Sequence, residues 1–186
     1  MDKRLAFRNR QALRPWIFMA LMIALGTLAN SAFSFPVGLT RCAPLQSLIN
    51  VVTAVYLGPW QAGLVASVIG ILRILSGTGT IFAIPGGVIG AVLAGLLYRS
   101  FGRPFWAGLG EIFGTSVIAA AVSVPLAAWV LGRAETFFGF FPGFAVSSII
   151  GGLAGVLLVR SLTMAGIGTD YLKVVSQPSG KDEQPA

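Results

Sequence analysis

The chain has 186 residues, of which 55% are hydrophobic and only 10% are charged. Soluble domains carry about 25% charged residues, so the composition excludes a soluble enzyme, a nucleic-acid-binding protein and a disordered protein. The net charge of +7 is typical of a membrane protein with basic cytoplasmic loops. One cysteine and no histidine exclude an internal disulfide, a Cys/His metal site and a histidine-based catalytic triad. We therefore expect a polytopic membrane protein that has no cofactor of its own.

Glycine and proline divide the chain into apolar runs of helical length. The first run, from Pro15 to about Phe35, has the roughly 20 residues of one bilayer crossing. The runs lack the alternation of polar and apolar residues that barrel strands show, so we expect no strands. The sequence predicts an all-α bundle of six transmembrane helices, at about 15–35, 43–57, 60–75, 82–98, 105–131 and 140–160. Pro125 is expected to kink the fifth helix.

The charged residues gather near the chain ends and predict the orientation. We expect a basic leader at 1–14, a single transmembrane domain at 15–160 and a disordered tail at 161–186. If both termini are cytoplasmic, ten basic residues lie inside and three lie outside, which fits the positive-inside rule. A signal peptide ending near Ala29 is the alternative for the first run, but that run is long for a signal sequence. The expected location is the inner membrane of a bacterium or archaeon.

Pairs of small residues four positions apart recur on the predicted helices, and they allow helix backbones to approach closely. The pairs are Ala20 and Ala24, Gly86 and Gly90, Gly110 and Gly114, and Gly151 and Gly155. For any one pair, packing inside the bundle is the simplest interpretation.

Polar residues inside the apolar runs are the candidates for function, because burying them in hydrocarbon is costly. Glu111 is the only acidic residue within such a run, so it is either functional or buried in a structural pair. Arg73 has the alternative of reaching the outer headgroups. Gln46 and Asn50 share one helix face and have the alternative of joining helices. Arg41 has the alternative of being a loop cation.

Several classes of membrane protein fit poorly. One carboxylate without histidine is a weak basis for an ion-coupled secondary carrier, and no inverted repeat is evident. Nothing in the chain resembles a selectivity filter or the motif of a membrane enzyme. Because there is no Walker A sequence, the chain cannot drive ATP-dependent uptake by itself.

The chain resembles the substrate-binding S components of energy-coupling factor vitamin transporters, and within them the ThiW group, which is associated with the thiazole half of thiamin. The general layout is similar over about 15–160, and the specific motifs lie between about 35 and 115. These motifs are Ala43-Pro44-Leu45-Gln46 with Asn50, Leu57-Gly58-Pro59-Trp60, Gly70-Ile71-Leu72-Arg73, the stretch from Gly77 to Gly86, and Gly110-Glu111 with Gly114-Thr115. The stretch from Gly77 to Gly86 is the most specific.

The resemblance implies that the chain captures its vitamin precursor on the outer side, under a flap between the first two helices. The partners would be a transmembrane T component, docking on Ala20 and Ala24 of the first helix, and two ATPase subunits that hydrolyse ATP. The ligand would be hydroxyethylthiazole or its phosphate. The expected substrate-binding residues are Glu111, Arg73, Asn50, Gln46, Arg41, Thr80 and Phe82. A small secondary carrier, or a membrane assembly protein without a small-molecule ligand, remains the alternative.

Overall fold

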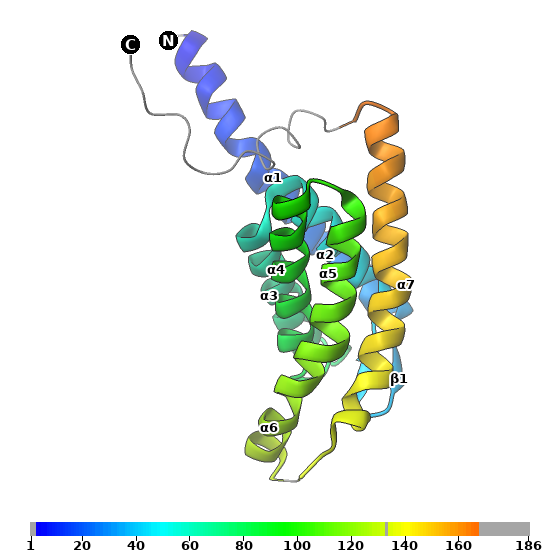
Figure 1. Ribbon diagram of the computed structural model, residues 1–186. Coiled ribbons are helices and arrows are strands. Elements are labelled where there is room, and N and C mark those ends of the chain that lie inside the picture. The colour runs from blue at the N-terminus through cyan, green and yellow to red at the C-terminus, as the bar shows by residue number, and fades with distance from the viewer. Residues whose placement is uncertain (1–2, 133, 168–186) are drawn as a thin grey trace, which may run out of the picture.

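The computed structural model describes residues 3–132 and 134–167, with side chains from Leu13 onward. Its long helices lie side by side in one bundle, as Figure 1 shows. The elements are α1 (Lys3–Phe33), β1 (Phe35–Val37), β2 (Thr40–Cys42), α2 (Pro44–Leu57), α3 (Pro59–Leu75), α4 (Ala83–Phe101), α5 (Pro104–Phe113), the π-helix η1 (Gly114–Ala119), α6 (Ala120–Leu131) and α7 (Phe137–Met164). The helical class predicted from the sequence is confirmed.

Four helical segments among the described residues are long and apolar enough to cross a membrane. They are Leu13–Phe33 of α1, the whole of α4, the joined segment Pro104–Leu131 and α7. The apolar helices α2 and α3 have 14 and 17 residues, which is short for a crossing. The N-terminal end of α1 and the C-terminal end of α7 lie at the same end of the bundle (Figure 1), whereas the β-hairpin and α6 lie at the other end.

Two helices, α1 and α7, are longer than the sequence predicts. Helix α1 begins at Lys3 and continues through Pro15, where the apolar run starts. The preceding residues include Ala, Leu, Arg and Gln, which are good helix formers even where they are polar. Helix α7 runs from Phe137 to Met164, beyond the predicted 140–160 at both ends. The part of the predicted tail from 168 to 186 lies outside the described residues.

The expectation that the chain contains no strands is wrong. Residues between α1 and α2 form an antiparallel hairpin in which Phe35 pairs with Cys42 and Val37 pairs with Thr40. Gly38 adopts a φ of 60° in the turn, a conformation that favours glycine. Each strand has three residues, which is too short for an alternating pattern to be visible in the sequence.

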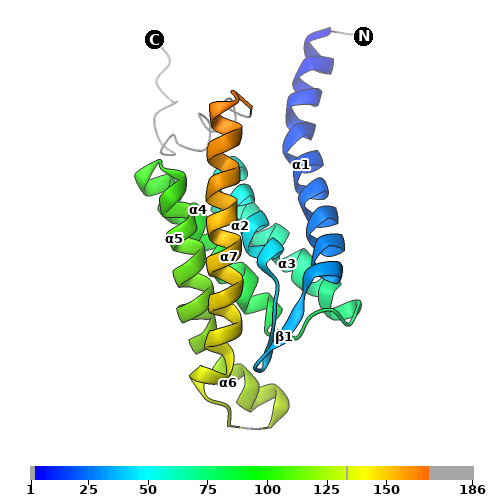
Figure 2. The ribbon, with the colours of Figure 1, turned by 90° about the vertical axis from the view of Figure 1, so that its right-hand side faces the viewer.

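The fifth predicted helix is interrupted by η1, a π-helical stretch that the sequence did not indicate. Such stretches carry an extra residue per turn and are frequent at functional sites. Pro125 lies further along, within α6. Figure 2 shows α6 turned away from the direction of α5 at the hairpin end of the bundle.

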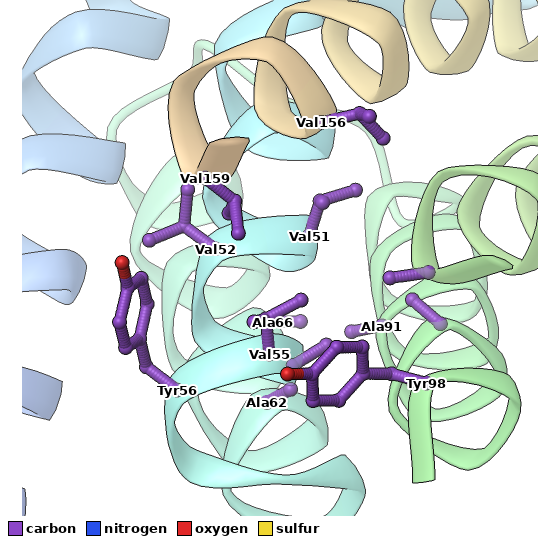
Figure 3. Packing of buried hydrophobic residues seen from close by; sticks show 13 residues of the cluster. Val51, Val52, Val55, Tyr56, Ala62, Ala66, Ala91, Tyr98, Val156 and Val159 are labelled. Carbon is purple, nitrogen blue, oxygen red and sulfur yellow. The ribbon is translucent and has the colours of Figure 1, made fainter. Parts of the chain in front are cut away.

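Helix α2 is the centre of the apolar core. Its residues Val51, Val52 and Val55 pack among Val156 and Val159 of α7 and residues of α3 and α4, as Figure 3 shows. Thirteen buried residues, mostly valines and alanines, form this cluster, so the helices approach closely.

The three glycine pairs lie in helix contacts inside the bundle. A Cβ on Gly110 would lie 2.8 Å from Cα of Ala94, and one on Gly155 would lie 2.8 Å from Cβ of Val51. Ala20 and Ala24 differ, because both are exposed on α1.

Candidate substrate-binding site

A small polar cavity lies in the half of the bundle nearest the hairpin. Its volume is about 30 Å³, and its lining comes from β2, α2, α3, α4, α5, η1 and α7. Five of the seven predicted binding residues line it, namely Arg41, Gln46, Asn50, Arg73 and Glu111. Residues up to 70 positions apart in the sequence thus meet at one place.

Glu111 is the deepest charged group of this cavity and is fully buried. Asn50 donates from Nδ2 to both carboxylate oxygens, at 3.1 and 3.3 Å. Thr115, one turn further along, lies with its hydroxyl 3.2 Å from Oε1 and 3.0 Å from the carbonyl oxygen of Gly86. These partners are neutral, so the carboxylate is held by hydrogen bonds. Asn50 also donates to the carbonyl oxygen of Gly87 at 3.1 Å and so connects α2, α4 and α5.

Arg73 occupies the part of the cavity nearer the hairpin. Its side chain is only 2% exposed, so it does not reach the headgroups as the alternative interpretation required. The guanidinium donates from Nη1 to Oε1 of Gln46 and from Nη2 to the carbonyl oxygen of Thr78, the latter at 3.4 Å. Gln46 and Asn50 lie one turn apart on the same face of α2. Gln46 contacts Arg73, and Asn50 contacts Glu111. One face of α2 therefore holds both ionisable groups, which do not contact each other directly.

Glycines of α4 make room for these polar side chains. A Cβ on Gly90 would lie 2.6 Å from Oε2 of Glu111 and would also clash with the Thr115 hydroxyl. A Cβ on Gly87 would clash with Nε2 of Gln46. Gly90, which was predicted to pack helices, therefore also shapes the site, and so does Gly87.

Four polar atoms of the lining residues are buried without a hydrogen-bond partner. They are Nε of Arg41, Nε2 of Gln46, Oδ1 of Asn50 and Nε of Arg73. Leaving such a group unpaired costs about 1–3 kcal/mol, and nearly all buried polar groups in folded proteins are paired. Three donors and one acceptor concentrated at one cavity are consistent with a ligand that supplies the complementary groups.

The hairpin contributes Arg41 to the cavity lining and contacts α7 on one side and the α3–α4 turn on the other. On one side, the backbone N–H of Leu39 donates to the carbonyl oxygen of Gly139 in α7 at 3.1 Å. On the other, Arg41 lies 3.3 Å from the carbonyl oxygen of Gly77 in the α3–α4 turn and 3.5 Å from that of Ser34. Arg41 is therefore held by the protein and is more than a loop cation.

Two predicted site residues do not line the cavity. The Phe82 ring is buried against Phe140, with 4.7 Å between ring centroids, in an apolar cluster whose other buried residues come from η1, α6 and α7. Thr80 lies in the α3–α4 turn, where its carbonyl accepts from Ala83 N–H at 2.9 Å. Residues that sequence reasoning missed do line it, namely Ser47, Thr115, Phe144 and Ser147. Ser147 accepts the N–H of Ala43 at the start of α2, at 3.1 Å.

A larger cavity of about 520 Å³ lies between α1, α2 and α7. Its lining is apolar, and it contains none of the buried charged groups. We place the candidate site at the smaller cavity, because a specific small-molecule site needs convergent polar groups.

Comparison with known families supports a transport role. The sequence model of the ThiW family, described as thiamine-precursor transporter proteins, matches residues 16–165. The chain belongs to the ThiW family. The match includes the apolar part of α1 from residue 16, all the later helices of the bundle and every residue of the cavity. A comparison with curated proteins finds no match. ThiW membership makes the chain a thiamine-precursor transporter, and the apolar helices make it a multi-pass membrane protein.

Proposed function

We propose that this ThiW protein is the S component of an energy-coupling factor importer. In this role it binds a thiamin-related thiazole at the outer side of the cell membrane. A T component and two ATPase subunits then drive its uptake, so the chain itself needs no cofactor. The observation that supports this best is the set of unpaired polar atoms beside Glu111, under a hairpin that joins the first two helices.

The unpaired atoms favour the thiazole alcohol over its phosphate. Asn50 Oδ1 needs a donor, which a hydroxyl supplies, whereas Arg41 Nε, Gln46 Nε2 and Arg73 Nε need acceptors. A hydroxyl oxygen and a ring nitrogen supply acceptors for two of these three donors. A phosphate dianion supplies acceptors but no donor, so the Asn50 oxygen would stay unpaired beside it.

Ligand entry requires the lining to move. Ligand pockets usually start at about 300 Å³, so a ring-sized ligand fits into a cavity of about 30 Å³ only after its walls separate. The hairpin is the segment best placed to move, because single hydrogen bonds to Gly139 and Gly77 hold its tip and its Arg41.

The test is ligand-dependent stabilisation of the purified protein. Hydroxyethylthiazole should raise the melting temperature, since a ligand at 100 times its Kd adds about 2.7 kcal/mol to the native state. The phosphate ester should raise it less at equal concentration, and an unrelated aromatic alcohol should not raise it. No stabilisation by any thiamin precursor would favour an assembly protein. Uptake into vesicles that contain this chain alone would favour a secondary carrier.

A further inference from the structure

The apolar cavity of about 520 Å³ is an open groove between α1 and α7 with α2 as its floor. Helix α1 packs on α2 and α3, while α7 packs on α2 from its other side. Figure 2 shows the resulting separation between α1 and α7, and Figure 3 shows the Tyr56 ring of α2 facing α1. The Tyr56 hydroxyl is satisfied by the carbonyl oxygen of Ile167 at 3.4 Å, so the groove offers a hydrocarbon surface.

One face of α1 lines this groove along its length. Phe18, Met22, Leu25 and Ala29 line it, and their spacing of four, three and four residues places them on one side of the helix. The eleven steps from Phe18 to Ala29, at about 1.5 Å each, span roughly 16 Å. That length is close to the roughly 15 Å of hydrocarbon in one leaflet of a bilayer.

A positively charged side chain, that of Arg14, lies at one end of the same face of α1. Arg14 precedes Phe18 by four residues, is exposed, and lies at the start of the membrane-spanning part of α1. Four further basic residues precede it in the sequence. A hydrocarbon groove that ends at an arginine near the membrane surface complements a lipid with apolar chains and an anionic headgroup.

The groove is distinct from the other exposed feature of α1. Ala20 lies two positions from both Phe18 and Met22 and therefore points away from the groove. Ala20 and Ala24 are exposed on that other side. A partner helix that docks on the alanines would leave the groove open to lipid.

We propose that this groove binds one anionic phospholipid, with an acyl chain along Phe18 to Ala29 and its headgroup at Arg14. The lipid belongs to the leaflet at which α1 enters the membrane. This inference does not depend on the ligand of the polar cavity.

The experiment uses the full chain in vesicles of equal parts phosphatidylglycerol and phosphatidylcholine with identical acyl chains. Gentle detergent extraction followed by native mass spectrometry counts the lipids that stay bound. We expect one retained lipid, predominantly phosphatidylglycerol. Arg14→Gln should lower the preference for phosphatidylglycerol about fivefold, the contribution of one arginine near an anionic surface. Arg103→Gln, at another exposed arginine near a helix end, should leave the preference unchanged.

Filling the groove tests the acyl-chain contact. Met22→Trp should remove the retained lipid, whereas Leu109→Trp on the exposed face of α5 should not. Equal retention by these two proteins would overturn the proposal, as would equal headgroup preference in the wild type and Arg14→Gln. A cysteine at Ala29 that crosslinks to another protein in native membranes would assign the groove to a protein partner and overturn the proposal as well. The variant with a cysteine at Ala29 also carries Cys42→Ser, which removes the native cysteine.

Discussion

Glu111 is the residue on which site and scaffold are hardest to separate, because its carboxylate both lines the cavity and accepts hydrogen bonds from two helices. Glu111→Gln retains the shape and one acceptor but removes the ionisable carboxyl group. We expect the Kd for hydroxyethylthiazole to rise at least tenfold, which is about 1.4 kcal/mol, while the melting temperature without ligand changes little. Calorimetric titration and thermal unfolding measure the two quantities.

The control for Glu111 is Ser123→Ala. Ser123 is buried on α6 and donates only to Ala119 of the same chain segment, at 2.7 Å, away from the cavity. The Kd of Ser123→Ala for hydroxyethylthiazole should equal that of the wild type. An unchanged Kd in Glu111→Gln together with a lower melting temperature would assign Glu111 to the scaffold.

Gln46 offers a sharper test of the unpaired donors. Its Oε1 accepts from Arg73, whereas its Nε2 has no partner. Gln46→Glu retains the bond to Arg73 and replaces the free donor by an acceptor. We expect about tenfold weaker binding of the thiazole alcohol without a lower melting temperature, whereas Gln61→Glu, at an exposed position of α3, should bind normally. Normal binding by Gln46→Glu would show that the ligand does not use this donor.

At the scale of elements, the hairpin rests on glycines of α7. A Cβ on Gly143 would clash with the Thr40 hydroxyl and lie 2.8 Å from the carbonyl oxygen of Val37. Overpacking of this kind costs about 1–3 kcal/mol, so Gly143→Ala should shift the hairpin away from α7. Cys42, which is fully buried on β2, reports the opening. Burial raises the pKa of the Cys42 thiol, and this lowers the fraction of reactive thiolate.

We therefore expect a maleimide to modify Cys42 at least fivefold faster in purified Gly143→Ala than in the wild type, which corresponds to about 1 kcal/mol. Gly70→Ala is the matched control, because the nearest atom to a Cβ there is 3.4 Å away, an ordinary contact. Ligand should slow the reaction in both proteins. Equal rates for Gly143→Ala and Gly70→Ala would mean that the α7 contact does not hold the hairpin closed.

The exposed alanines of α1 give the second prediction at this scale. Ala20→Trp or Ala24→Trp would hold a partner helix away, because both positions are exposed on the lipid side of α1. We expect loss of co-purification with the T component, and unchanged thiazole binding. Leu109→Trp introduces the same side chain on α5 and should leave the complex intact. An intact complex in both alanine variants would exclude this face as the docking surface.

At the scale of the whole molecule, the N-terminal end of α1 and the C-terminal end of α7 lie at one end of the bundle, and the polar cavity lies toward the other. Single cysteines in a Cys42→Ser protein test the orientation. Ser76→Cys, after α3 on the hairpin side, should react with an impermeant maleimide in intact cells. Ser100→Cys, at the opposite end of α4, should react only after the cells are opened. The reverse pattern would place the N-terminal end of the chain outside.

The sequence by itself determined the class of the molecule and the approximate position of each long helix, because apolar runs divided by glycine and proline are local features. It also identified Gln46, Asn50, Arg73 and Glu111, because a polar group in an apolar run is costly wherever the helix packs. The hairpin and Thr115 escaped prediction. A three-residue strand shows no periodicity, and a threonine hydroxyl can bond to its own helix, so its presence carries little signal.

Tertiary structure decided which faces of the helices meet. It placed three glycine pairs inside the bundle and left Ala20 and Ala24 exposed, although all four pairs have the same spacing. Phe82 and Phe144 belong to the same buried cluster, but the structure brings only Phe144 to the cavity. The sequence, with its 13 phenylalanines, does not show which one reaches the site. The reason is that spacing along a helix defines a face, whereas the neighbouring helices determine whether that face meets protein, ligand or lipid.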